Sequence, residues 1–171
     1  QDLCGITLMS GSGLVSVAPT IKRNEIMTNP ATGGYYIEDL EIGMEESFVK
    51  EVTEDLIVAF AEISGDTNPV HLDEEYAKTT RFKGRIAHGL LTAGFISTVL
   101  GTKLPGPGSI YLHQDLVFRA PVRIGDVVTS SVKVEKINFH RRVVTLSCSC
   151  VVNNRVVIGG EAVMMVPPRE A

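Results

Sequence analysis

The stretch Gly89–Leu100, GLLTAGFISTVL, carries no charged side chain. It is too short to cross a bilayer, which takes about 20 apolar residues. A helix that is apolar on every side is predicted to be buried on every side. One small sheet hardly encloses such a helix, so we expect a second copy of the chain to help cover it.

The overall composition is that of an ordinary globular domain. The 171 residues are 44% hydrophobic and 21% charged, and the net charge is −4. This balance gives no electrostatic reason to expect nucleic acid as a partner, and no apolar run is long enough for membrane insertion. The three cysteines are Cys4, Cys148 and Cys150. The sparse, odd set predicts no disulfide framework and a reducing compartment, the cytoplasm or the mitochondrial matrix.

The N-terminal segment, residues 1–34, differs from the rest in composition. It is rich in Gly, Ser, Thr and Pro and lacks sustained hydrophobic periodicity, which predicts a flexible segment or a processed remnant. A transit-peptide remnant is the alternative, supported only by Lys22 and Arg23. We expect the folded domain to span residues 35–168, with a short tail at 169–171.

The first half of that domain reads as a strand followed by helices. Residues 44–52 predict a strand, and Thr53 suits the N-cap of a helix that ends at Gly65. A short helical turn is predicted over residues 73–80. The apolar helix follows from His88 or Gly89 to Leu100, with Gly101 as its end.

The second half reads as about four antiparallel strands, over residues 109–118, 126–137, 142–152 and 155–166. Asn153-Asn154 suits a tight hairpin turn, because Asn tolerates positive φ. In the first of these strands, alternation predicts that Ile110, Leu112, Gln114, Leu116 and Phe118 share one face. The fold class is therefore α+β, with one apolar helix wrapped by a curved antiparallel sheet.

An acid and a base lie close together in the segment SGDTNPVH, Ser64–His71. Gly65 and Pro69 are predicted to hold the backbone out of helix. Across such a bend Asp66 and His71 can point into one cavity, and each can move protons near neutral pH. The alternative is that Asp66 bonds its own backbone in an Asx turn and His71 is a structural histidine. Spacing alone favours this alternative.

Several longer stretches resemble the MaoC-like, (R)-specific enoyl-CoA hydratase family. They are SGDTNPVHLDEEYA, RIAHGLLTAGFIS, LPGPGSIYLHQDLVFRAPVRIGD and GEAVMMVP. The resemblance covers residues 35–168 and implies the hot-dog fold, a long helix in a curled antiparallel sheet. It also implies reversible hydration of a trans-2-enoyl thioester to an (R)-3-hydroxyacyl thioester.

The resemblance carries residue roles as well. It places catalysis on Asp66 and His71 and the oxyanion-binding backbone N–H on Gly89. Asn68 and Ser97 are expected to support the site. Apart from the resemblance, His88 is a further candidate for support because it directly precedes Gly89, and a structural or surface role is the alternative. The resemblance implies no metal and no bound cofactor, since the coenzyme A or acyl-carrier-protein thioester is itself the substrate. It also points to a homodimer.

Other functions make different demands on the same fold. A thioesterase, or a dehydratase that uses a helix Glu, would place a carboxylate on the apolar helix, and Gly89–Leu100 has none. A non-catalytic acyl-thioester-binding module could dispense with Asp66 or His71, and both are present. A 3-hydroxyacyl-acyl-carrier-protein dehydratase of fatty-acid synthesis stays open. Arg81, Lys83 and Arg85 are expected either to meet the substrate's phosphates or only to solubilise their loop. His113 and His140 are expected to be structural or surface residues.

Overall fold

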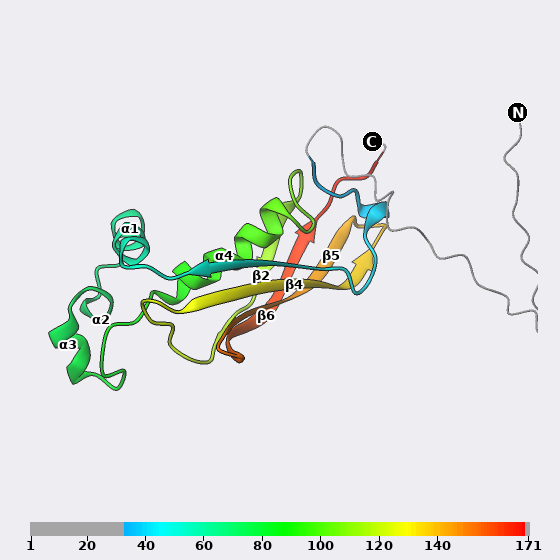
Figure 1. The fold of residues 1–171 in the computed structure, drawn as a ribbon. Helices are drawn as coiled ribbons and strands as arrows, with labels where there is room; N and C mark the ends of the chain where they lie inside the picture. Colours follow the sequence, from blue (N-terminus) through cyan, green and yellow to red (C-terminus); the bar gives the residue numbers. More distant parts are fainter. Residues whose placement is uncertain (1–32, 170–171) are drawn as a thin grey trace, which may run out of the picture.

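The computed structural model describes residues 33–169 (Figure 1). The predicted N-terminal segment therefore lies outside the described residues, apart from Gly33 and Gly34. The last two residues, Glu170 and Ala171, lie outside them as well.

The core of the fold is a six-stranded antiparallel sheet with the order β1-β4-β5-β6-β2, with β3 beside β6. Side chains alternate between a buried and a solvent-facing side along β4 and β5, as period-two patterning predicts. Asn153 and Asn154 join β5 to β6 with φ values of 48° and 62°, which confirms the predicted turn. The strands are β1 Glu45–Glu51, β2 Ile110–Gln114, β3 Val117–Phe118, β4 Val127–Asn138, β5 Val143–Val152 and β6 Arg155–Met165.

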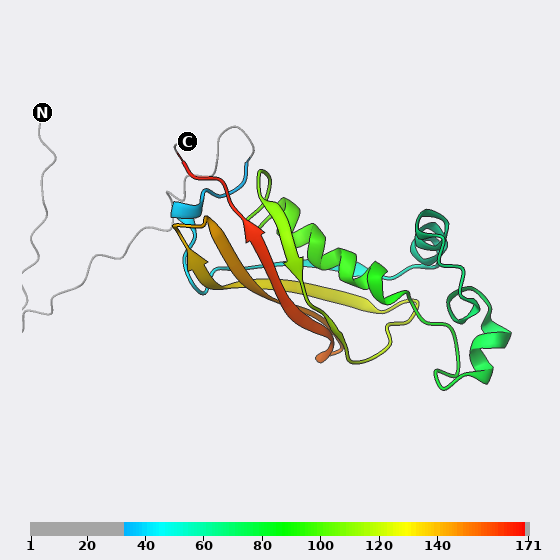
Figure 2. The ribbon, with the colours of Figure 1, turned by 180° about the vertical axis from the view of Figure 1, so that it is seen from behind.

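The apolar helix, α4 (Gly89–Thr102), lies along one face of this sheet and packs against β1, β4 and β5 (Figures 1 and 2). Its buried residues Phe95, Ile96 and Leu100 join the side chains of the inner sheet face in one hydrophobic core. This arrangement confirms the α+β prediction and the hot-dog architecture. The helix runs slightly past Gly101, which lies inside it rather than at its end.

The single chain does not bury α4 on every side, which agrees with the expectation that one small sheet hardly encloses it. Leu90 is 64% exposed, and Gly94, Ser97 and Gly101 are exposed along the same outer face. The sheet covers only one side of the helix. The outer face of α4 lacks the charged residues that usually cover the exposed side of a helix. Its other residues are small, so it offers a flat, uncharged surface.

The predicted strand over residues 109–118 is also wrong as a single element. The register against β6 shifts between Tyr111 and His113, and the strand breaks before Val117, giving β2 and β3. A bulge interrupts the two-residue period, so the five predicted residues do not share one face. Ile110, Tyr111 and Leu112 are all exposed on this edge.

Three short helices gather at one end of the molecule, beyond the sheet (Figure 1). They are α1 (Glu54–Ser64), α2 (Pro69–Leu72) and α3 (Glu74–Thr79). Thr53 Oγ1 accepts a hydrogen bond from the Leu56 N–H, and Gly65 ends α1 with a φ of 75°, both as predicted. A 3₁₀ turn, η1 (Ile37–Asp39), lies near the C-terminal end of the chain. Within residues 33–169, no helix has the length and apolar character to cross a membrane.

The segment between α1 and α3 is less irregular than predicted, because α2 forms there. Pro69 occupies the first turn of α2, and Asn68 caps it by accepting a hydrogen bond from the Val70 N–H. Proline suits this position because its missing N–H would have no helical partner there. The break is therefore confined to residues 65–68, and His71 lies on a helix.

We predict that the side of α1 that faces the core contributes most of what this helix adds to the stability of the fold. Ile57 is fully buried and Ile63 is 87% exposed on the same helix. Ile57→Ala should lower the free energy of unfolding by about 2–5 kcal/mol, because it leaves a cavity. Ile63→Ala, which removes the same atoms, should cost less than about 0.5 kcal/mol. Urea denaturation at one protein concentration checks both, and equal losses would contradict the packing described.

Candidate active site

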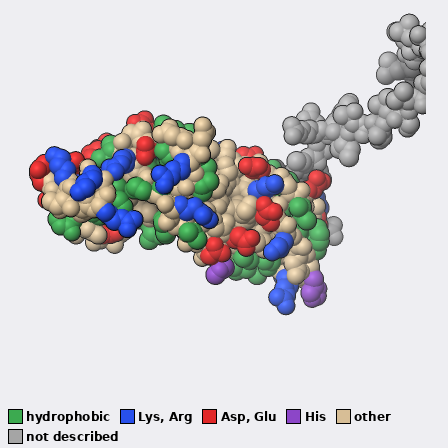
Figure 3. All heavy atoms as spheres, turned by 90° about the horizontal axis from the view of Figure 1, so that it is seen from below, with side chains coloured by type: hydrophobic (Ala, Val, Ile, Leu, Met, Phe, Trp, Pro, Cys, Tyr) green, Lys and Arg blue, Asp and Glu red, His purple; other side chains and the backbone are tan. Residues whose placement is uncertain are grey.

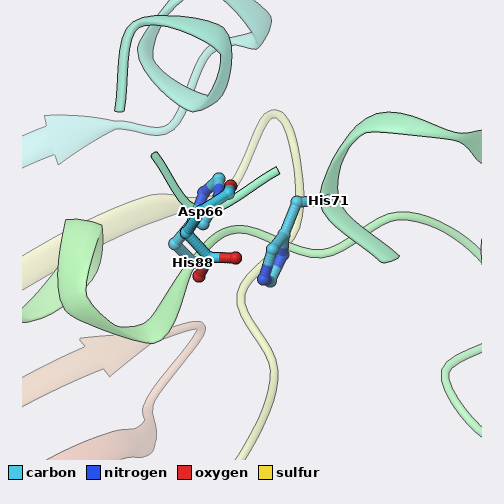
Figure 4. A group of neighbouring side chains, drawn as sticks. All are labelled: Asp66, His71 and His88. Atoms are coloured by element: carbon cyan, nitrogen blue, oxygen red, sulfur yellow. The ribbon is translucent and has the colours of Figure 1, made fainter. Parts of the chain in front are cut away.

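Asp66, His71 and His88 converge from three separate segments (Figure 4). One nitrogen or carboxylate oxygen from each lies within 4.8 Å of the others. Asp66 is exposed on the loop after α1, His71 is buried in α2, and His88 is buried immediately before α4. The structure thus brings together the predicted Asp–His pair and adds a second imidazole.

The ring of His71 is oriented by the backbone. Its Nδ1 lies 2.9 Å from the Ile86 carbonyl oxygen, so the proton sits on Nδ1 and Nε2 carries the free lone pair. Burial lowers the pKa of His71 below its ordinary value of 6.5, and the nearby His88 and Arg85 act in the same direction. The Ile86 carbonyl and Asp66 act against this shift in the pKa. His71 is therefore neutral at pH 7 and can accept a proton at Nε2.

Asp66 is part of a turn, as the structural alternative expected. Its Oδ1 accepts a hydrogen bond from the Asn68 N–H at 3.3 Å, and its own N–H donates to Ser64 Oγ at 3.2 Å. The turn leaves the second carboxylate oxygen available and keeps the carboxylate beside the imidazoles. A turn role and a proton-transfer role are compatible here, and the catalytic role of Asp66 stays a prediction.

His88 touches both members of the pair. Its Nε2 lies 2.9 Å from the Asp66 carbonyl oxygen, and its ring centroid lies 3.9 Å from that of His71. The centroid of the His88 ring also lies 4.9 Å from that of the Phe60 ring. Its Nδ1 is buried and has no hydrogen-bond partner within the described residues. The sequence pointed to His88 only through its position before Gly89.

A cleft of about 250 Å³ opens beside this group and reaches His71 and Gly89. Asp66 and Ser97 are not among the residues that line it. Its walls are mostly apolar, with two arginines among them. The lining residues are His71, Arg81, Phe82, Ile86, Ala87, Gly89, Thr92, Phe118, Arg119, Ala120, Pro121, Val122 and Ile158.

Gly89 begins α4 at the wall of the cleft. The first N–H groups of a helix have no partner inside it and mark the positive end of the helix dipole, so this position suits an oxyanion. A Cβ atom on Gly89 would lie 2.7 Å from the Phe118 ring. A larger residue here would therefore require the exposed Phe118 ring to shift, a contact that the sequence did not reveal.

Ser97 does not join the group. It lies on the exposed face of α4, about 12 Å along the helix from Gly89 by the rise per residue, and its supporting role stays a prediction. Thr92, which the sequence analysis missed, is the hydroxyl residue that lines the cleft. It is buried, and its Oγ1 has no partner within the part of the chain that the structure describes. Helical spacing from Gly89 could have indicated it.

The basic residues divide into two groups. Arg85 is engaged internally: its Nε donates to the His71 carbonyl at 2.6 Å, and its guanidinium pairs with Glu54 at 2.8 Å. It therefore supports α2 rather than meeting phosphates. Arg81 lines the cleft, as does Arg119, which the sequence analysis missed. Figure 3 shows Lys and Arg side chains over the end of the molecule that carries α1–α3.

Two imidazoles and a carboxylate are also a combination that binds divalent transition metals. Asp66, His71 and His88 are the group within residues 33–169 that could hold such an ion. The expectation that the site needs no metal stays a prediction.

Comparisons with known proteins fit this geometry. A 3-hydroxybutyryl-CoA dehydratase of Methylorubrum extorquens is 54% identical over 135 residues, covering 79% of this chain and 86% of that protein. An (R)-specific enoyl-CoA hydratase of Rhodospirillum rubrum is also 54% identical over 135 residues, covering 79% of this chain and 94% of that protein.

The structural comparison agrees. The unliganded R-hydratase PhaJ1 of Pseudomonas aeruginosa superposes with a TM-score of 0.75 at 39% identity, covering 80% of this chain and 88% of that one. The MaoC-like domain matches residues 40–154, a span that contains every predicted site residue. With most of the folded domain matched in sequence and in structure, the chain belongs to the MaoC-like domain family.

Proposed function

We propose that this protein is an (R)-specific enoyl-CoA hydratase, which adds water reversibly to trans-2-enoyl-CoA to give (R)-3-hydroxyacyl-CoA. One observation carries the proposal. The Asp66 carboxylate lies beside His71, whose Nε2 carries the free lone pair, and His71 lines a cleft that reaches the first residue of α4. The names of the relatives from Methylorubrum and Rhodospirillum support the same reaction.

The chemistry follows from these groups. As the water oxygen bonds to C3 of the enoyl thioester, the C2–C3 π bond opens and negative charge develops on the thioester oxygen. The Gly89 N–H, at the positive end of α4, donates to that oxygen. Asp66 and His71 together take one proton from water and deliver one to C2, so the pair ends in its starting protonation state. The proposal assigns both transfers to the pair as a unit.

We propose coenzyme A as the carrier. Arg81 and Arg119 in the cleft wall can pair with phosphate groups, and both relatives named above carry CoA in their names. An acyl-carrier-protein dehydratase would use the same chemistry and is the second candidate. The absence of Asp and Glu from α4 still argues against a thioesterase that depends on a helix carboxylate.

We also propose a homodimer. The outer face of α4 exposes Leu90, and β2 ends the sheet with Ile110, Tyr111 and Leu112 exposed. An edge strand offers unpaired backbone groups to a second strand. Pairing of two β2 edges would extend the sheet and cover apolar surface near the cleft, which supports a site shared by two chains.

A reducing compartment, the cytoplasm or the mitochondrial matrix, is part of the proposal. Cys148 and Cys150 are buried free thiols two residues apart on β5. Burial raises the pKa of the Cys148 thiol to about 12, so it stays protonated at neutral pH. Both thiols are packed as small core residues, which supports a role in the core rather than in a disulfide.

The proposed reaction makes a direct prediction. The protein should hydrate the conjugated double bond of crotonyl-CoA, and the decrease in ultraviolet absorbance measures this reaction. The product should be (R)-3-hydroxybutyryl-CoA. Chiral chromatography of the product checks the configuration. Mainly (S) product, or no turnover of crotonyl-CoA or longer enoyl-CoA thioesters, would reject the proposed function.

Asp66→Asn and His71→Ala should each lower kcat by about 10²–10⁴-fold, the usual worth of general acid–base catalysis. Asp66→Asn keeps the turn acceptor but removes the charge, and His71→Ala removes Nε2. If both residues act on one water, the double variant should be about as slow as the worse single variant.

His140→Ala, at an exposed position, is the matched control for loss of an imidazole and should keep full activity. Near-normal turnover by Asp66→Asn, with an unchanged melting temperature, would leave Asp66 as a turn residue only. Multiplicative losses in the double variant would show that the two residues act independently.

Sedimentation equilibrium at micromolar concentration should give twice the chain mass of 18.5 kDa. Leu112→Glu places a charge on the β2 edge and should shift the protein toward single chains. Ile63→Glu puts the same charge on the exposed side of α1 and should leave the mass unchanged. An 18.5 kDa species alone in the unaltered protein would exclude the dimer.

A further inference from the structure

We propose that His88 is a positioning residue that holds the Asp66 carboxylate in its working place and acts through Asp66. The inference rests on the proposed hydration reaction. His88 is buried and Asp66 is exposed, so contact with substrate is assigned to Asp66 and not to His88.

The loop that carries Asp66 is tied to the rest of the protein through His88. The other hydrogen bonds found at residues 65–68 of the described chain join residues at most four positions apart. The bond from His88 Nε2 to the Asp66 carbonyl spans 22 residues. It connects the exposed loop to the start of α4, where Gly89 lies.

The donor atom of this bond is itself fixed. His88 is 1% exposed, and its ring packs against the rings of Phe60 and His71. The preceding residue, Ala87, donates its N–H to the Val122 carbonyl at 2.7 Å, and the His88 carbonyl accepts from Thr92. A buried donor holds the exposed loop more firmly than a solvent-exposed one would, because water does not compete for the donor.

The protonation of the ring points to the same role. Donation to a carbonyl places the proton on Nε2, which leaves Nδ1 bare, buried and without a partner in the described part of the chain. An unpartnered buried polar atom costs stability, and an apolar ring of the same size would avoid this cost. The Nε2–H bond to Asp66 is the gain that offsets it.

Two substitutions separate the hydrogen bond from the ring. His88→Phe keeps the ring and its stacking but removes the donor, and His88→Gln places an amide N–H near the position of Nε2. We expect His88→Phe to lower kcat about 10²-fold, the usual effect of misplacing a catalytic group by about 1 Å. KM should change much less, because substrate contacts stay, and His88→Gln should recover most of kcat.

A double-variant comparison tests whether His88 acts through Asp66. In an Asp66→Asn background the carboxylate is already gone, so adding His88→Phe should lower kcat by less than about threefold. The same loss in both backgrounds, or normal kcat in His88→Phe, would overturn the proposal. If His88→Phe does not fold, His88→Met and His88→Gln, which match in length, replace it with the same expected contrast.

A second readout does not depend on catalysis. Hydrogen exchange of the peptide covering residues 62–70 should speed up in His88→Phe and stay near normal in His88→Gln. Equal exchange in the two variants would overturn the positioning role. If the unaltered protein hydrates no enoyl-CoA, the proposed function fails, and this exchange measurement still decides whether His88 holds the loop.

Discussion

The packing of α4 against the sheet determines where the reactive groups can lie. Burial of Phe95, Ile96 and Leu100 fixes the axis of the helix, and Gly89 begins the helix at the wall of the cleft. The proposed oxyanion position thus belongs to a helix that is packed on the core rather than to a loop. Everything else in the site is arranged around that fixed point.

The acid–base pair joins this rigid part through a few directed contacts. Arg85 links α1 to the His71 backbone, and the Ile86 carbonyl sets the tautomer of the His71 ring. The Asp66 loop has mostly local bonds of its own, so a contact from the start of α4 is needed to hold it. In the proposed reaction, the buried, neutral His71 and the exposed Asp66 carboxylate can then meet at one water while each keeps its own environment.

The sequence predicted most of the fold because its signals were local and physical. Thr53 and Gly65 marked the ends of α1, and the Asn153-Asn154 pair marked the hairpin between β5 and β6. It failed where a tertiary contact decided the outcome. The bulge near His113 depends on pairing with β6, and it breaks the single strand that was predicted over residues 109–118.

The same division holds in the site. The motif brought out Asp66 and His71, but not the carbonyl that orients the His71 ring or the contacts of His88. Arg119 and Thr92 line the cleft, and the sequence analysis assigned neither of them a role. For Arg85 the sequence left open a phosphate contact or a solubilising role, and in the structure it bonds to the His71 carbonyl and to Glu54, which supports α2.

The most direct measurement is a crystal structure of the Asp66→Asn variant with crotonyl-CoA bound. The account predicts the thioester oxygen within hydrogen-bond distance of the Gly89 N–H, with C2 and C3 facing the side chains at positions 66 and 71. Binding with the thioester oxygen away from the start of α4, or with the enoyl group out of reach of His71 Nε2, would contradict it.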